Sequence, residues 1–277
     1  MEGKLDNERE EHERRSECGP EAQSARGTQV ASAGFAGSSV LFANRIGAVP
    51  WTIWDVGIAA AVFVPVGFGG SFGLALALSL TGLVENEALA VVLGSTLLPL
   101  ALLAGTWVFS AWRHKVPLAL LGFRQTSVTS LLWLPAAALA VGLSISAAYA
   151  LLVQTFGFDT LVPDQDLDEI AALKGVARLS TFAIVGVLAP FAEEVFFRGF
   201  MLAAFASLLG GMRGAILSSA MFSVLHLNAS TLLPIFVMGM LLAWLYLRTG
   251  SIWPSVVAHA AQNILALTFM GMPGDAF

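Results

Sequence analysis

The chain has 277 residues, of which 57% are hydrophobic and 12% are charged, and its mean hydropathy is +0.78. Soluble domains carry about 25% charged residues, so this composition excludes an ordinary soluble domain and indicates an integral membrane protein. The net charge of −5 argues against a nucleic-acid partner, and the single cysteine, Cys18, excludes an intramolecular disulfide or a thiolate metal site.

Residues 1–45 form a polar N-terminal segment that is rich in Glu, Arg, Ser and Gly. Such a segment cannot bury enough apolar area to fold alone, so we expect a disordered tail. No short apolar core follows a basic start, which argues against a secretory signal.

Residues 46–170 are predicted to contain the N-terminal transmembrane helices. No charge occurs between Asp55 and Glu85, a second uncharged run ends at Trp112, and a third span is expected over 131–156. Runs of this kind exceed the ~20 residues that a spanning helix needs. The acidic connection at 159–169 lacks the glycine and glutamate spacing of a calcium loop, so we interpret it as a solvated loop.

Residues 171–277 contain the remaining predicted spans. The first of these spans begins near Leu179 and runs into the segment of Glu193 and Glu194. The uncharged run over 214–247 is expected to split into two helices at Asn228, Ser230 and Pro234. The last span covers 252–270. The sequence therefore predicts an all-α polytopic transmembrane helix bundle of about seven spans. The number rises to eight if the segment after Arg198 spans separately.

Lysine and arginine residues near the span ends predict the orientation. Cytoplasmic loops carry the excess of these residues, and a cytoplasmic N-terminus leaves just Lys174 and Arg178 outside. We therefore expect a plasma membrane protein whose tail and turns at 113–130 and 248–250 are cytoplasmic. The residues then placed inside are Arg45, Arg113, Lys115, Arg124, Arg198, Arg213 and Arg248.

A pair of adjacent glutamates lies within one of the most apolar stretches. An ionised side chain at the centre of a bilayer costs on the order of 3 kcal/mol, so such residues generally serve a function. Glu194 and Arg198 are four residues apart and lie on one face of a helix, where they can pair and support the site. Glu193 points about 100° away and has no local partner, which leaves it free to handle a proton.

Two histidines also fall within apolar runs, on different helices. Phe222 precedes His226 by four residues and can restrict its rotamers, while His259 and Asn263 share one face of the last helix. His226 lies roughly 20 Å along a helix from Arg213, deeper than His259, so a tilt or a deep cavity is needed to bring the imidazoles together.

These residues have two coherent chemical uses. In one, His226 and His259, with a carboxylate or an amide, hold a divalent cation such as zinc that activates water. In the other, Glu193 takes a proton from water with help from His226, while His259 and Asn263 donate to the oxyanion. Both schemes hydrolyse an amide. The H-E-x-x-H zinc motif is absent, which disfavours a conventional zinc site.

The ordered set E-E-x-x-x-R (Glu193, Glu194, Arg198), F-x-x-x-H (Phe222, His226) and H-x-x-x-N (His259, Asn263) resembles the CAAX protease and bacteriocin-processing family, also called CPBP or Abi. The resemblance covers roughly residues 175–268. It implies a catalytic transmembrane region at 171–277 that opens to the cytoplasm, and a membrane-associated or lipidated protein as substrate. It also implies that Glu193 activates water beside His226, and that His259 and Asn263 hold the oxyanion or a metal.

Two other functions are compatible with the same residues. Glu193, His226 and His259 could form the proton or cation relay of a transporter or channel, although no internal repeat supports that. A non-catalytic immunity or scaffold protein could keep the family fold, although intact motifs disfavour it. The sequence therefore favours a membrane peptidase, with substrate specificity carried by the N-terminal helices.

Overall fold

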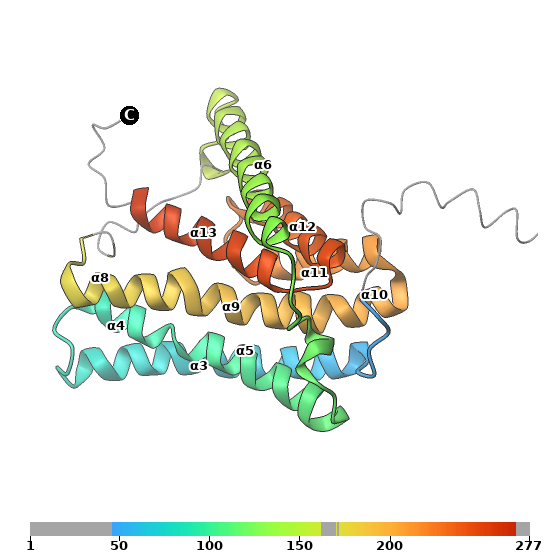
Figure 1. The fold of residues 1–277 in the computed structure, drawn as a ribbon. Coiled ribbons are helices and arrows are strands. Elements are labelled where there is room, and N and C mark those ends of the chain that lie inside the picture. Colours follow the sequence, from blue (N-terminus) through green and yellow to red (C-terminus); the bar gives the residue numbers. More distant parts are fainter. Residues whose placement is uncertain (1–45, 162–169, 171, 270–277) are drawn as a thin grey trace, which may run out of the picture. The chain divides into compact units, whose positions relative to one another are not determined.

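The structure, a computed structural model, describes residues 46–161, 170 and 172–269. The predicted tail at 1–45 and nearly all of the acidic connection lie outside these residues, so both interpretations stay predictions. The described residues form helices and contain no β-strand, as the sequence predicts (Figure 1).

The N-terminal helices precede the glutamate pair. Helix α3 begins with a capping box, in which the Asp55 carboxylate accepts from the Thr52 backbone N–H at 2.8 Å and the Thr52 hydroxyl accepts from the Asp55 N–H at 3.4 Å. The elements are α3 (Ile53–Leu80), α4 (Glu87–Gly94), α5 (Leu97–Trp107), the π-helical η2 (Val108–Trp112), the 3₁₀ turn η3 (Leu118–Leu121), α6 (Val128–Thr155) and the 3₁₀ turn η4 (Asp159–Leu161).

The second half contains one long helix followed by three separate ones. The long helix runs without a break through α8 (Gly175–Thr181), η5 (Phe182–Leu188), α9 (Ala189–Glu194), η6 (Val195–Leu202) and α10 (Ala203–Leu209). The later helices are α11 (Gly211–Val224), α12 (Leu232–Thr249) and α13 (Trp253–Phe269).

Five helical stretches in the described residues are long and apolar enough to cross a membrane, so the chain is a polytopic helical membrane protein. They are Ile53–Leu80, Glu87–Trp112, Val128–Thr155, Gly175–Leu209 and Leu232–Thr249. Helices α11 and α13 are shorter, with 14 and 17 residues. The idea of an eighth span after Arg198 is wrong, because that segment continues the helix that carries Glu193 and Glu194.

The uncharged run over 214–247 is divided as predicted. The Asn228 carboxamide oxygen accepts from the backbone N–H of Ser230 at 3.0 Å and from its hydroxyl at 2.7 Å, which stabilises the turn. Leu227 has a φ of 54°, in the left-handed region that non-glycine residues rarely adopt. Pro234 lies in the first turn of α12, where a missing N–H is tolerated, so Pro234 does not cause the break.

The long helix is widened on both sides of α9 by the π-helical segments η5 and η6. Pro190 in α9 has no N–H to offer the carbonyl one turn earlier, within η5. In η6, the carbonyl of Phe197 accepts from the Ser218 hydroxyl at 2.8 Å, and that of Phe200 accepts from the Trp51 indole at 2.9 Å. Side chains from α11 and from the residues before α3 thus hold the segment that carries Arg198.

The short element α9 and its continuation η6 contact helices from both halves of the chain. Helix α5 packs against α9 and η6, α11 packs against η6 and α12, and α13 packs against α9, η5, α12 and α6 (Figure 1). The turn η3 also packs closely against η6, at a glycine. A Cβ on Gly199 would lie 2.6 Å from the backbone carbonyl oxygen of Leu121.

We expect Gly199→Ala to lower the stability of the protein by about 1–3 kcal/mol, because the Leu121 carbonyl is backbone and cannot rotate away from the new methyl group. Gly57→Ala is the matched control, since a Cβ there meets nothing within 4 Å. Alanine at that helical position should maintain or raise the melting temperature. Thermal unfolding in detergent micelles, followed by tryptophan fluorescence, checks both variants. Equal melting temperatures for Gly199→Ala and wild type would contradict the packing argument.

Candidate active site

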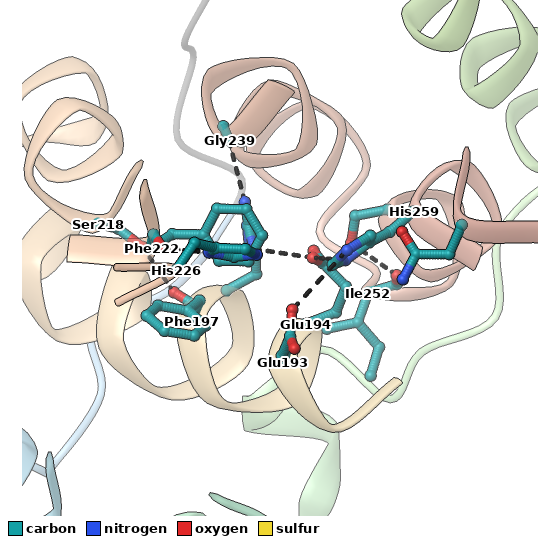
Figure 2. A network of polar contacts seen from close by, with 12 residues as sticks. Glu193, Glu194, Phe197, Ser218, Phe222, His226, Gly239, Ile252 and His259 are labelled. Atoms are coloured by element: carbon teal, nitrogen blue, oxygen red, sulfur yellow. Dashed lines mark hydrogen bonds and ion pairs between the residues drawn. The ribbon is translucent and has the colours of Figure 1, made fainter. Parts of the chain in front are cut away.

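Glu194 and Arg198 form a fully buried ion pair. Both side chains are 0% exposed, and the Arg198 Nη1 lies 2.8 Å from the Glu194 Oε1. The Arg198 Nη2 donates to the carbonyl of Gly239 in α12 at 3.2 Å, and the guanidinium carbon lies 4.4 Å from the centre of the Phe222 ring (Figure 2). The Glu194–Arg198 contact predicted from their spacing is therefore present. The other two contacts of Arg198 join η6 to α11 and α12.

His259 of α13 lies between the two glutamates. Its Nδ1 donates to the Glu194 Oε1 at 3.0 Å, and its Nε2 lies 3.7 Å from the Glu193 Oε2 (Figure 2). A carboxylate can only accept a hydrogen bond, so the Nδ1 carries a hydrogen. The partner of Glu193 thus comes from a distant helix, which the local spacing could not show.

The cluster joins two acidic side chains to one arginine and one histidine within apolar helices. Glu194 and Arg198 are both 0% exposed, whereas Glu193 is 21% exposed. The His259 Nε2 and the Glu193 Oε2 lie 3.7 Å apart, so two side chains of the kinds that act as general acids and bases face each other at the edge of the cluster.

Phe222 contacts both imidazoles. Its ring centre lies 4.7 Å from that of His226 and 5.6 Å from that of His259, both edge to face. The two histidines therefore meet at one aromatic ring, although they lie on different helices. The His226 Nδ1 donates to the Phe222 carbonyl at 2.8 Å, which leaves Nε2 for other contacts (Figure 2).

Asn263 contacts the backbone of the long helix. Its Nδ2 donates to the carbonyl of Val185 in η5 at 2.9 Å. His259 and Asn263 thus face the same helix from one side of α13, in line with their spacing. A carboxamide has two N–H groups, so one remains after the bond to Val185.

A cavity of about 210 Å³ adjoins the site, and Glu193 and His226 both line it. The other lining residues are apolar: Val64, Phe68, Leu98, Leu102, Phe197, Phe222 and Leu225. Sequence reasoning missed those from α3 and α5, because nothing distinguishes them from many other apolar residues. It also missed Gly239, although a glycine in an apolar helix is a known sign of close helix contact.

The sequence also suggested His226 and His259 as zinc ligands. In the described ranges, no three His, Cys, Asp or Glu side chains are grouped so that they could hold a metal ion. The His259 Nδ1 and the His226 Nδ1 are both hydrogen-bond donors, which leaves the Nε2 of each ring as the nitrogen that could bind a metal. Two such nitrogens are fewer than the three protein ligands of a catalytic zinc site, so the grouping of the described side chains does not fit such a site.

The chain is similar to a known protein family. Residues 175–265 match the family described as "Type II CAAX prenyl endopeptidase Rce1-like". This segment contains Glu193, Glu194, Arg198, Phe222, His226, His259 and Asn263. No solved structure matches the chain.

Two curated proteins resemble part of the chain. The UPF0177 protein YxdF of Lactococcus lactis subsp. lactis (strain IL1403) is 27% identical over 82 residues, which are 29% of this chain and 45% of that protein. A protein provisionally named membrane peptidase YdiL, from Bacillus subtilis (strain 168), is 30% identical over 80 residues, which are 29% of this chain and 33% of that protein. The matches therefore span less than half of each relative.

We expect Arg198→Leu to destabilise the protein by about 3–5 kcal/mol, because it leaves the Glu194 carboxylate buried without its cation. The double variant Glu194→Gln/Arg198→Leu should recover part of this loss, since it removes both charges. Thermal unfolding in detergent provides the comparison. A double variant that is no more stable than Arg198→Leu would show that the ion pair is not what holds η6 in place.

Proposed function

We propose that the chain is an intramembrane endopeptidase, because residues 175–265 match the Rce1-like type II CAAX prenyl endopeptidase family. Its proposed reaction is hydrolysis of a peptide bond in a membrane-associated or lipidated protein. One observation carries the proposal: Glu193 and His226 line a common cavity among apolar helices, and His259 lies 3.7 Å from Glu193.

Glu193 is the carboxylate suited to activate water. Its side chain is 21% exposed, whereas that of Glu194 is 0% exposed and already accepts from Arg198 and His259. Glu193 takes a proton from water as the oxygen attacks the substrate carbonyl, which is general-base catalysis. Glu194 and Arg198 hold His259 and the helix in position.

The imidazoles are proposed to handle the proton and the developing negative charge. His226 lines the cavity, and its Nε2, which the Nδ1 hydrogen bond leaves unused, is proposed to assist Glu193. His259 donates from a protonated Nε2 to the oxyanion, and the remaining Asn263 N–H is the proposed second donor. Glu193 then gives the proton that it took from water to the departing amine as the carbon–nitrogen bond breaks, which completes the hydrolysis.

The proposed orientation places the turns at 113–130 and 248–250 in the cytoplasm. Two hydrogen bonds support the placement of both turns on one side of the membrane. The Ile252 N–H donates to the Gly122 carbonyl at 3.0 Å, and the Ser251 hydroxyl donates to the Arg124 carbonyl at 2.8 Å. With α11 and α13 counted as spans, the bundle has the seven that we propose. The proposed partners of the bundle are the membrane lipid around it and a protein or peptide substrate.

We expect Glu193→Gln to reduce cleavage by at least about 100-fold, because an amide cannot accept the proton of water at neutral pH. The melting temperature should stay close to that of the wild type, since Glu193 is not part of the Glu194–Arg198 pair. Mass spectrometry of a membrane-tethered reporter peptide in proteoliposomes measures the products. Glu87→Gln, at an exposed position in α4, is the matched control and should cleave normally. Full cleavage by Glu193→Gln, or ion flux without a peptide product, would overturn the proposal.

We expect metal chelators to leave cleavage unchanged, because the donor set does not fit a three-ligand metal site. The measurement compares cleavage rates before and after dialysis against EDTA and 1,10-phenanthroline, with the metal content determined by mass spectrometry. Loss of activity that added zinc restores would overturn the metal-free mechanism and favour zinc on His226 and His259.

A further inference from the structure

One wall of the cavity at the proposed site comes from helices outside the family domain. Val64 and Phe68 lie on α3, and Leu98 and Leu102 lie on α5, whereas the family match begins at residue 175. Glu193 and His226 belong to the matched segment. The residues that react and much of the surface that a substrate contacts therefore come from different parts of the chain.

The structure shows that this wall is firmly held. Val64 and Leu102 are 8% and 3% exposed. A Cβ on Gly67 would lie 2.8 Å from the Leu98 Cδ1 and 3.0 Å from the Leu98 Cα, so the two helices touch at this level. The Leu98 N–H, which has no acceptor within its own helix at this position, donates to the Ser71 hydroxyl of α3 at 3.1 Å.

Phe68 occupies a different position in the wall. Its side chain lines the cavity and is 38% exposed, so it lies at the edge of the cavity, on the outside of the helix bundle. Removing its ring therefore widens the cavity without leaving a void inside the core.

The composition of the lining limits what can bind there. Among the lining residues, Glu193 and His226 are polar and the other seven are apolar. A charged substrate side chain would lose its hydration against the α3–α5 wall without finding a partner. The volume of about 210 Å³ is also smaller than the roughly 300–1,000 Å³ of pockets that enclose a whole drug-sized ligand. The space therefore suits one side chain beside the reacting carbonyl rather than a long lipid chain.

We propose that Val64, Phe68, Leu98 and Leu102 form a specificity subsite for an uncharged, medium-sized apolar side chain next to the scissile bond. This inference rests on the proposed function, because the subsite is defined by its position beside Glu193 and His226. The lipid anchor of a substrate lies outside this subsite.

The test uses the full chain in proteoliposomes with membrane-tethered reporter peptides that differ at one residue, Ala, Leu, Trp or Asp, beside the mapped cleavage site. The wild type should prefer Leu to Ala by at least about tenfold in kcat/KM, because each methylene in a fitted apolar pocket is worth about 10- to 200-fold. It should cleave the Asp peptide least. Phe68→Ala should raise cleavage of the Trp peptide relative to Leu by about tenfold.

Two further variants complete the design. Leu102→Phe narrows the cavity and should shift the preference from Leu towards Ala. Phe72→Ala is the matched control, because Phe72 lies one turn from Phe68 on the same helix, is 72% exposed and does not line the cavity. It should keep the wild-type order. If Phe68→Ala and Leu102→Phe also keep the wild-type order of peptide preference, the subsite proposal is overturned, while the proposed peptidase activity stands.

Binding separates this inference from the proposed reaction. Fluorescence anisotropy of the same labelled peptides with Glu193→Gln reports on the cavity even if no peptide is cleaved. The subsite is supported if the Leu peptide binds more tightly than the Asp peptide, if adding Phe68→Ala weakens this preference, and if adding Phe72→Ala does not. Equal binding of the Leu and Asp peptides overturns it.

Discussion

The buried ion pair between Glu194 and Arg198 is the interaction on which the rest of the site depends. Each charge would be costly among apolar helices by itself, and their contact at 2.8 Å lowers that cost. The pair then positions other groups, because Glu194 accepts from His259 of α13 and Arg198 donates to Gly239 of α12. Helices α12 and α13 are thereby held against the segment that carries Glu193, whose side chain is 21% exposed.

Phe222 gives the site its second organising contact. The ring packs edge to face against both imidazoles and lies under the guanidinium of Arg198, so it excludes water from one side of the cluster. An apolar residue thus determines how polar residues from η6, α11 and α13 meet. The arrangement separates two groups of residues: the interior charges join the helices, and the groups that line the cavity are those that we propose for the substrate.

Much of the fold and part of the site were predictable from the sequence. Uncharged runs located α3 and α6 within a few residues, and the i, i+4 spacing identified the Glu194–Arg198 contact, because both depend on local periodicity. The contact between His259 and the glutamates depends on how distant helices pack, and no local pattern contains that information. The same holds for the apolar cavity wall. The continuity of the long helix through Arg198 was left open by the sequence, because a charge within an apolar run can mark the end of a span.

The π-helical segments on either side of α9 have a consequence for how the protein can change in evolution. Each π turn accommodates extra backbone within a continuous helix, so the angular position of the glutamates depends on the exact number of residues in η5 and η6. Loss of one residue from either segment turns everything beyond it by about 100° about the helix axis. An insertion or deletion in this helix would therefore separate the glutamates from their partners on the neighbouring helices.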